Sequence, residues 1–373
     1  MFRNIKVLVV DDSAFMRKAI SDMINSQKDM EVIGIARNGL EAINKALDLN
    51  PDIITLDVEM PKMNGLEALK EIKKRTKCEV IMLSSLTIEG SGITMDCLKE
   101  GAFDFIQKPS GSISLDINIL VNELCEKIRY AYSHSKKIKD NIKINKSNVY
   151  NLGNGNNISQ KPRKVDVSVK AIVIGASTGG PKILFDILTS IPNGIDIPIF
   201  VVQHMPKGFT KAFADRINKS SELNVVEAKD KEKIQKNTIY IAPGGYHMTI
   251  KSKDEIALDM SPAIHGVRPA VDKLFKSASH IYKDSLLGCI CTGMGKDGAE
   301  GIKAIKGIGG YNIAQDEETS VVYGMPRAAY ETGCVDIVLP YYKIADEIVR
   351  VIRRKWLQWN FLKLWLMLKA HLE

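Results

Sequence analysis

Short apolar runs alternate with helical patterns along two separate stretches of this 373-residue chain. In the first stretch, strand-like runs lie at 6–10, 31–36, 53–56, 80–83 and 103–106. A second alternation begins at Val169 and continues to about Lys355. Buried strands that alternate with helices are typical of parallel sheets with helices on both faces. The sequence therefore predicts two doubly wound α/β domains, of which the second is the larger.

The length of the chain also suggests two domains, and composition marks their boundaries. We expect domains at 1–132 and 169–355. Residues 133–168 are polar, basic and dotted with asparagine and glycine, which predicts a flexible linker. Residues 356–373 concentrate all three tryptophans beside lysines. This tail could lie at a membrane surface, pack on the second domain or reflect an altered reading frame.

Composition excludes several classes of protein. Apolar residues make up 45% of the chain and charged residues 26%, as in ordinary soluble globular proteins. The start of the chain has no signal-peptide pattern. The six cysteines are scattered along the chain, which is typical of reduced thiols, so we expect a cytoplasmic location. Much of the net charge of +8 lies in the linker and the tail. Because a basic linker is usually only solvated, nucleic acid is not an expected partner.

Polar side chains stand at the ends of several strands of the first domain. Asp11 and Asp12 follow the first strand and Asp57 ends the third, while Ser84 and Lys108 end the fourth and fifth. These strand ends meet around one crevice in such a fold. Clustered carboxylates suit Mg²⁺, and a lysine can bind a phosphate oxygen. Asp57 is then free to become an aspartyl phosphate, although each Asp could simply cap a turn.

Three polar residues of the second domain also follow apolar runs. Ser177 lies in a G-x-S-x-G pattern that opens a helix, His204 ends a strand, and Asp297 lies in a glycine loop after another strand. The serine loop alone leaves a hydrolase, a nucleotide-binding loop and a plain turn open, although Pro181 replaces the lysine of a P-loop. With a histidine and an aspartate at the same sheet edge, a hydrolytic triad is the leading hypothesis.

Three further histidines compete for the role of the base. His247 is expected in a turn near the site, His265 precedes a loop on the substrate side, and His280 lies in a helix. We rank all three below His204 for this role.

Residues 3–130 resemble the receiver domain of two-component response regulators. The matching strings are VVDDS at 9–13, LDVEMPKMNGL at 56–66, MLSS at 82–85 and QKP at 107–109. The resemblance implies that a histidine kinase phosphorylates Asp57, with Mg²⁺ held by Asp11, Asp12 and Asp57. It also implies that Ser84 and Lys108 contact the phosphoryl group and that Phe105 is the aromatic switch residue. Asn64 replaces the usual aspartate of the turn and keeps its turn chemistry.

Residues 169–355 resemble the catalytic domain of the chemotaxis protein-glutamate methylesterases, the CheB family. The matching strings are IGASTGGP at 174–181, VQHMP at 202–206, IAPGGYH at 241–247, RPAVD at 268–272 and TGMGKDGA at 292–299. The resemblance implies hydrolysis of γ-glutamyl methyl esters on chemoreceptors and deamidation of receptor glutamines. Contact with membranes would then be only indirect, through the receptors.

The resemblance also implies roles for single residues. Ser177 would be the nucleophile, His204 the base and Asp297 the residue that orients the imidazole. Backbone N–H groups of Thr178 and Met294 are candidates for oxyanion stabilisation, and Arg268 for substrate contact. No metal or other cofactor is expected in the esterase step.

The unphosphorylated receiver is expected to cover the esterase cleft, and phosphorylation of Asp57 is expected to loosen this contact. The alternative function is a response regulator whose second domain only binds a nucleotide or a protein.

Overall fold

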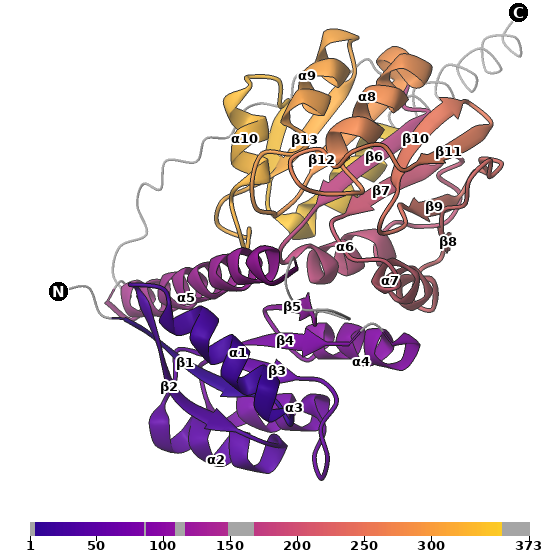
Figure 1. Cartoon of the computed structure of the whole chain (residues 1–373). Helices are drawn as coiled ribbons and strands as arrows, with labels where there is room; N and C mark the ends of the chain where they lie inside the picture. Colours follow the sequence, from indigo (N-terminus) through magenta and orange to yellow (C-terminus); the bar gives the residue numbers. More distant parts are fainter. Residues whose placement is uncertain (1–3, 86, 109–115, 148–167, 353–373) are drawn as a thin grey trace, which may run out of the picture. The chain divides into compact units, whose positions relative to one another are not determined.

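The computed structural model describes residues 4–85, 87–108, 116–147 and 168–352 (Figure 1). The chain divides into two compact units, residues 1–158 and 159–373. The tail at 356–373 and the part of the expected linker at 148–167 lie outside the described residues. No helix in the described ranges is both long and apolar enough to cross a membrane.

The first unit is built on a five-stranded parallel sheet with the order β2-β1-β3-β4-β5. Its strands are β1 (Ile5–Val10), β2 (Met30–Ala36), β3 (Ile53–Asp57), β4 (Glu79–Ser84) and β5 (Asp104–Gln107). Its helices are α1 (Ala14–Asn25), α2 (Gly39–Leu49), α3 (Gly65–Arg75), α4 (Ile88–Lys99) and α5 (Asp116–Ser147). Asn64 caps α3 together with Glu67, so the asparagine that replaces the usual aspartate does hold this turn.

Helix α5 is longer than the sequence analysis expected. We expected the first domain to end at residue 132 and a flexible linker to follow, but α5 continues to Ser147. The segment contains neither glycine nor proline, so nothing in it breaks a helix. Leu124, Ile128 and Ala131 are buried on one side of it, with the spacing of a helix face. The first part of the expected linker is therefore helical.

The second unit is built on a seven-stranded parallel sheet with the order β14-β13-β12-β6-β7-β9-β8. Its strands are β6 (Ala171–Ala176), β7 (Ile199–Gln203), β8 (Asn224–Glu227), β9 (Thr238–Ile241), β12 (Leu286–Ile290), β13 (Tyr311–Gln315) and β14 (Ile337–Leu339). An antiparallel hairpin joins β10 (His247–Ser252) to β11 (Glu255–Asp259). The helices are α6 (Gly180–Thr189), α7 (Phe209–Asn218), α8 (Val271–Tyr282), α9 (Ala299–Gly307) and α10 (Met325–Glu331), with the short 3₁₀ helix η1 (Lys283–Ser285).

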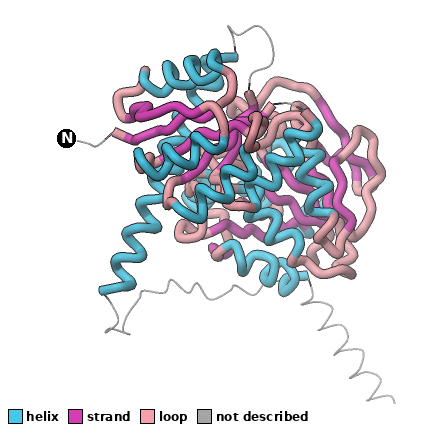
Figure 2. The backbone as a smooth tube through the Cα atoms, turned by 90° about the horizontal axis from the view of Figure 1, so that it is seen from below, coloured by secondary structure: helices cyan, strands magenta, loops and turns pink. Residues whose placement is uncertain are grey.

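Helices lie on both faces of each sheet (Figures 1 and 2). In the second unit, α6 packs with α7 while α8 packs with α9, and these two pairs cover opposite faces. The prediction of two parallel-sheet α/β domains is confirmed.

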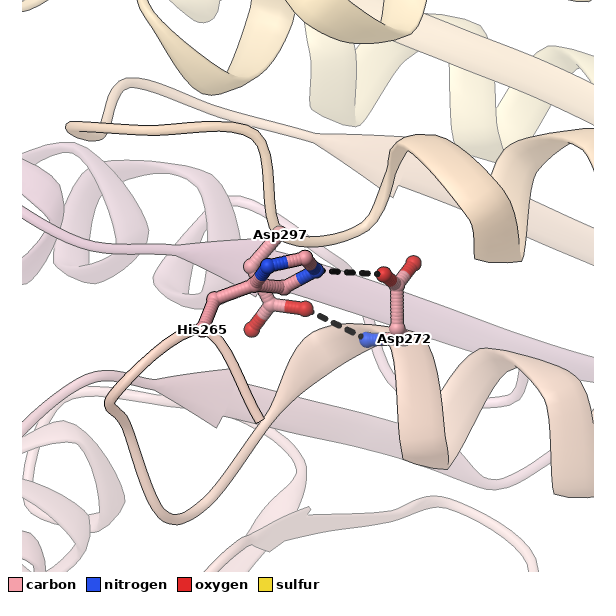
Figure 3. A group of neighbouring side chains, drawn as sticks. All are labelled: His265, Asp272 and Asp297. Atoms are coloured by element: carbon pink, nitrogen blue, oxygen red, sulfur yellow. Dashed lines mark hydrogen bonds and ion pairs between the residues drawn. The ribbon is translucent and has the colours of Figure 1, made fainter. Parts of the chain in front are cut away.

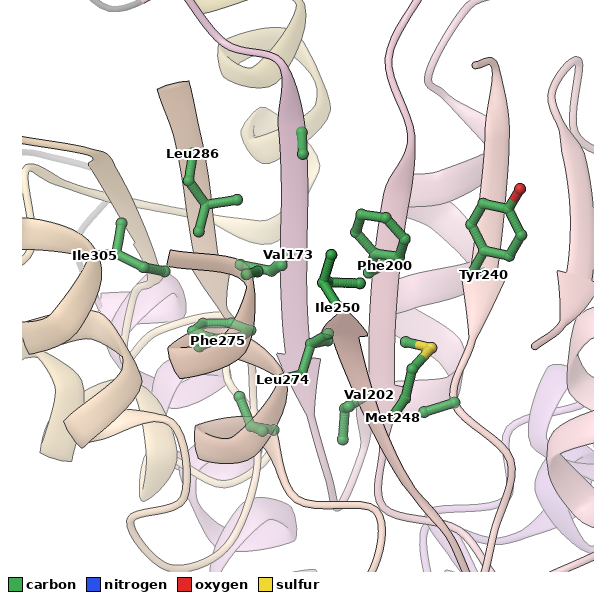
Figure 4. Packing of buried hydrophobic residues seen from close by; sticks show 14 of the residues in the cluster. Val173, Phe200, Val202, Tyr240, Met248, Ile250, Leu274, Phe275, Leu286 and Ile305 are labelled. Atoms are coloured by element: carbon green, nitrogen blue, oxygen red, sulfur yellow. The ribbon is translucent and has the colours of Figure 1, made fainter. Parts of the chain in front are cut away.

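A buried apolar cluster fixes α8 and the hairpin against the sheet of the second unit (Figure 4). Leu274 and Phe275 of α8 and Ile250 of β10 pack toward Val173 and Phe200 of the central strands. Full burial of one such side chain is worth about 1.5–3 kcal/mol. The cluster therefore holds α8 firmly, and the position of its first turn matters for the site.

Candidate active site and phosphoacceptor site

Three neighbouring strands at the centre of the second sheet carry the residues predicted to react. Strand β6 lies between β7 and β12, so the chain order reverses beside it. Ser177 follows β6, His204 follows β7, and Asp297 lies in the loop after β12. Ligands of open parallel sheets bind at the carboxyl ends of strands where the order reverses.

His204 and Asp297 are in direct contact. Nε2 of His204 lies 2.8 Å from Oδ2 of Asp297, and both side chains are largely buried. A carboxylate accepts hydrogen bonds only, so the Nε2–H group donates to Asp297. The other ring nitrogen, Nδ1, is then the one that carries the lone pair of the neutral ring. His204 is thus held in one tautomer, with Nδ1 available as a base.

Asp297 is also bound by the first turn of α8. The N–H groups of Val271 and Asp272 donate to Asp297 Oδ2 and Oδ1 at 2.7 and 2.9 Å. Burial acts to raise the pKa of Asp297, but the hydrogen bond from His204 and these two backbone donors outweigh it, and the pKa is lowered. Asp297 therefore stays ionised beside His204.

The loop of Ser177 is tied to both neighbouring strands. The N–H of Ser177 donates to the carbonyl of Thr292 at 2.9 Å, and the N–H of His204 donates to the carbonyl of Ala176 at 3.1 Å. A Cβ added at Gly293 would lie 2.8 Å from Cβ of Ser177, so glycine allows this close approach. The partly exposed Ser177 hydroxyl makes no hydrogen bond to any described residue. Among the residues that the structure describes, His204 is thus joined to Asp297 and the serine hydroxyl has no partner.

The two predicted oxyanion donors are available. Within the described ranges, neither the N–H of Thr178 nor that of Met294 has a hydrogen-bond partner. Thr178 precedes the N-terminus of α6, and Met294 follows Gly293, which contacts Ser177. Free N–H groups at a helix N-terminus favour an anion, so these loops suit a negatively charged oxygen.

Arg268, the predicted substrate contact, is used within its own loop. Its Nη1 donates to the carbonyls of Met260 and Ser261 at 2.7 and 3.0 Å. The guanidinium therefore shapes the loop between β11 and α8. Its contact with a substrate stays a prediction.

The other histidines have structural partners. Nδ1 of the fully buried His247 accepts from the N–H of Ala270 at 3.2 Å, and Nε2–H donates to the carbonyl of Pro262 at 3.1 Å. Burial lowers the pKa of His247, which favours its neutral form. His280 lies on the exposed side of α8, where Nδ1–H donates to the Lys276 carbonyl at 2.6 Å.

His265 lies closer to the acid than the sequence suggested. Figure 3 shows His265 beside Asp272 and Asp297, and its Nε2 lies 3.2 Å from Oδ2 of Asp272. Ligand atoms of the three residues lie within 4.8 Å of one another, a grouping that could hold a metal ion. However, Asp297 already accepts three N–H groups, and Asp272 accepts the N–H of Gly301 at 2.7 Å. These hydrogen bonds explain why the three residues lie together: they support α8.

The acidic residues of the first unit also meet. Nζ of Lys108 lies 2.7 Å from Oδ2 of Asp57 and 2.8 Å from Oδ2 of Asp11. Carboxylate oxygens of Asp11, Asp12 and Asp57 lie within 4.8 Å of one another. Burial raises the pKa of Asp57 to about 6, against the opposing effect of Lys108. A set of carboxylate oxygens fits Mg²⁺, which prefers hard oxygen ligands.

The two predicted switch residues of this unit are buried. Oγ of Ser84 accepts a hydrogen bond from Oγ1 of Thr94 at 2.8 Å, a contact that the sequence analysis did not foresee. Phe105 is 4% exposed, and Nζ of Lys127 lies 5.7 Å from its ring centroid. Their roles as switch residues stay predictions.

Comparison with known proteins identifies the family. Residues 172–348 match the family model of CheB methylesterases, and residues 7–119 match that of response regulator receiver domains. A protein-glutamate methylesterase/protein-glutamine glutaminase from Clostridium acetobutylicum is 49% identical over 94% of this chain and 98% of its own length. This chain belongs to the CheB family. CheB relatives of the same name from Thermotoga maritima and Pyrococcus horikoshii are 48% and 46% identical, each over 94% of this chain. The resemblance drawn from the motifs is confirmed.

Proposed function

We propose that this chain is a phosphorylation-regulated esterase that removes methyl groups from γ-glutamyl methyl esters of chemoreceptors and deamidates receptor glutamines. Family membership over nearly the whole chain supports this activity. The observation that carries the proposal is the His204–Asp297 pair, held on the first turn of α8 beside the Ser177 loop.

In the first step, Oγ of Ser177 attacks the ester carbonyl while Nδ1 of His204 takes the hydroxyl proton. Asp297 stabilises the imidazolium that forms, because it accepts the Nε2–H group. The N–H groups of Thr178 and Met294 stabilise the tetrahedral oxyanion. His204 then returns the proton to the leaving methoxide, and methanol departs from the acyl-enzyme.

In the second step, water attacks the acyl-enzyme and gives up a proton to Nδ1 of His204. The tetrahedral intermediate collapses, Ser177 regains its proton, and the glutamate carboxylate is released. A glutamine side chain follows the same course, with ammonia as the leaving group. Both reactions thus require the same serine and the same histidine.

The receiver unit regulates this activity in the proposal. A chemotaxis histidine kinase transfers a phosphoryl group to Asp57, and Lys108, which already pairs with that carboxylate, contacts it. Asp11, Asp12 and Asp57 would hold Mg²⁺, which would reduce the repulsion between the phosphoryl group and the carboxylates. Phosphorylation then relieves a block by the receiver on the esterase cleft. A cytoplasmic location belongs to the same proposal.

The test is methanol release from membranes that carry methylated chemoreceptors. Ser177→Ala removes the nucleophile, so methanol release should fall by at least about 10³-fold. Ser190→Ala is the matched control, because Ser190 is exposed at the end of α6 and its hydroxyl donates to the Asp186 carbonyl. Ser190→Ala should release methanol at the wild-type rate. Release of methanol by Ser177→Ala at that rate would refute Ser177 as the nucleophile, and no release by the wild type would favour a non-catalytic output domain.

A further inference from the structure

Gln203 is a buried polar residue between the proposed nucleophile and the proposed base. It is the last residue of β7, pairs with Ala176 of β6, and is 2% exposed. Its Nε2 lies 2.9 Å from the carbonyl oxygen of Ser177 and 3.2 Å from that of His204. One side-chain amide therefore binds the backbone of both residues.

Chemistry fixes the orientation of this amide. The reverse orientation would place Oε1 against two carbonyl oxygens, which cannot donate a hydrogen bond. With Nε2 toward the carbonyls, Oε1 points to Gly180, where an added Cβ would lie only 2.1 Å from it. Oε1 is buried and has no hydrogen-bond partner among the described residues. A buried unpaired acceptor costs stability, a cost that the two hydrogen bonds donated by Nε2 offset.

The geometry of the peptide group links Gln203 to the oxyanion. The carbonyl of Ser177 and the N–H of Thr178 belong to one planar trans peptide unit, so they point in opposite directions. The Ser177 carbonyl accepts from Gln203 Nε2 and from the N–H of Gly180, the latter at 2.7 Å. These two donors fix the direction in which the N–H of Thr178 points.

We propose that Gln203 is a positioning residue that orients the oxyanion donor of Thr178 and holds the backbone of His204 in register with it. The inference rests on the proposed function, because it needs an oxyanion at this place. Gln203 does not touch the substrate. It acts through the Ser177–Thr178 peptide plane.

The test is Gln203→Leu in the full-length chain, which keeps a similar volume but removes both donors. An oxyanion interaction is made in the transition state and not with the bound ester. We therefore expect kcat for methanol release to fall by about 10- to 100-fold, and KM to change by less than about threefold. Gln203→Asn, whose amide is one methylene too short to bridge both carbonyls, should show the same split, and it carries the test if the leucine variant does not fold.

Asn312 offers a matched control within the same sheet. Its Nδ2 also donates to two carbonyls, those of Ile302 and Cys334, both at 2.9 Å. Its Oδ1 is likewise buried without a partner among the described residues. Asn312→Leu should lower Tm as Gln203→Leu does, but should leave kcat of the folded enzyme within about twofold.

The outcomes are distinct. A loss of kcat at Gln203 without a loss at Asn312, with KM nearly unchanged, supports the proposal. Wild-type kcat in Gln203→Leu, a change confined to KM, or equal losses of kcat in both variants would overturn it. Ser177→Ala tests the function separately: if that variant is inactive while Gln203→Leu is fully active, only the role of Gln203 is refuted.

Discussion

At the residue scale, Asp297 has two structural duties at once. Helix α8 begins after Ala270, which offers no side-chain cap, and the Asp297 carboxylate from another loop binds its first N–H groups instead. Such a charge at a helix N-terminus contributes about 0.3–2 kcal/mol. In the structure Asp297 caps α8 and contacts His204 with the same carboxylate.

Gly293 gives a prediction at this scale. An alanine Cβ there would lie 2.3 Å from Sδ of Met325 and 2.8 Å from Cβ of Ser177. Gly293→Ala must therefore displace the Ser177 loop, and methanol release should fall by about 10²-fold. Gly307→Ala is the control, because nothing lies within 4 Å of its added Cβ. It should keep full activity, and equal activity of the two variants would show that the close approach at Gly293 is unimportant.

The residue scale also shows what sequence patterns can and cannot reveal. The placement of Ser177, His204 and Asp297 after neighbouring strands was predictable, because each follows an apolar run and parallel strands bring such ends together. Gln203 and Asp272 were missed because their partners come from distant segments, as with Asp272 and Gly301. The one available signal for Gln203 was a polar side chain that ends an otherwise buried strand.

At the element scale, the loop that leads into α8 supports the site. His247 at the start of β10 binds the N–H of Ala270 and the carbonyl of Pro262, so it fixes the loop that leads into α8. The apolar cluster around Leu274 and Phe275 holds the rest of the helix. Asp297 then depends on α8 for its position, although the two belong to separate loops of the sequence.

His247 gives a prediction of pH dependence. Its pKa in the folded chain lies below the ordinary value of 6.5 because of burial. As pH falls below 6.5, the unfolded chain binds a proton that the folded chain does not, so the free energy of unfolding decreases until the folded pKa is passed.

His247→Gln removes this titration but keeps a hydrogen-bonding side chain. Between pH 7 and 5, we expect the free energy of unfolding to fall less steeply for the variant than for the wild type. Urea unfolding at several pH values measures this difference. Parallel curves for the two proteins would refute the assignment of a neutral, structural His247.

At the element scale, the apolar periodicity of the sequence is also a limited guide to the structure. The parallel strands of both sheets followed the alternation of the sequence, but their order within the sheets was not predicted. The end of α5 was not predicted either, because the polar residues after Tyr132 have little apolar period to reveal a helix. The helix continues there because the segment contains no helix-breaking residue, and a pattern of buried positions does not reveal this property.

At the scale of the whole molecule, the proposed phosphoacceptor site and the proposed hydrolytic site lie in separate compact units of one chain. The family joins the same two domains, and this chain matches both family models. In the proposed regulation, phosphorylation of Asp57 in one unit changes the reactivity of Ser177 in the other. This is a property that neither unit has by itself.

Asp57→Asn tests that regulation. The variant keeps a side chain of the same size but cannot form an aspartyl phosphate, so basal methanol release should persist. Stimulation by a small phosphodonor such as acetyl phosphate should be lost. Asp52→Asn is the control, because Asp52 lies before β3 and accepts from the N–H of Lys6. That control should respond like the wild type. A phosphodonor response in Asp57→Asn would place the switch at another residue.

The most direct measurement of the central claim is the site and rate of covalent labelling by a reactive organophosphonate, mapped by mass spectrometry. The account expects one adduct, on Ser177, with labelling slowed by about 10²-fold or more in His204→Ala because Nδ1 is the base that activates the hydroxyl. An adduct on another residue, or labelling of Ser177 at an equal rate in His204→Ala, would contradict the account.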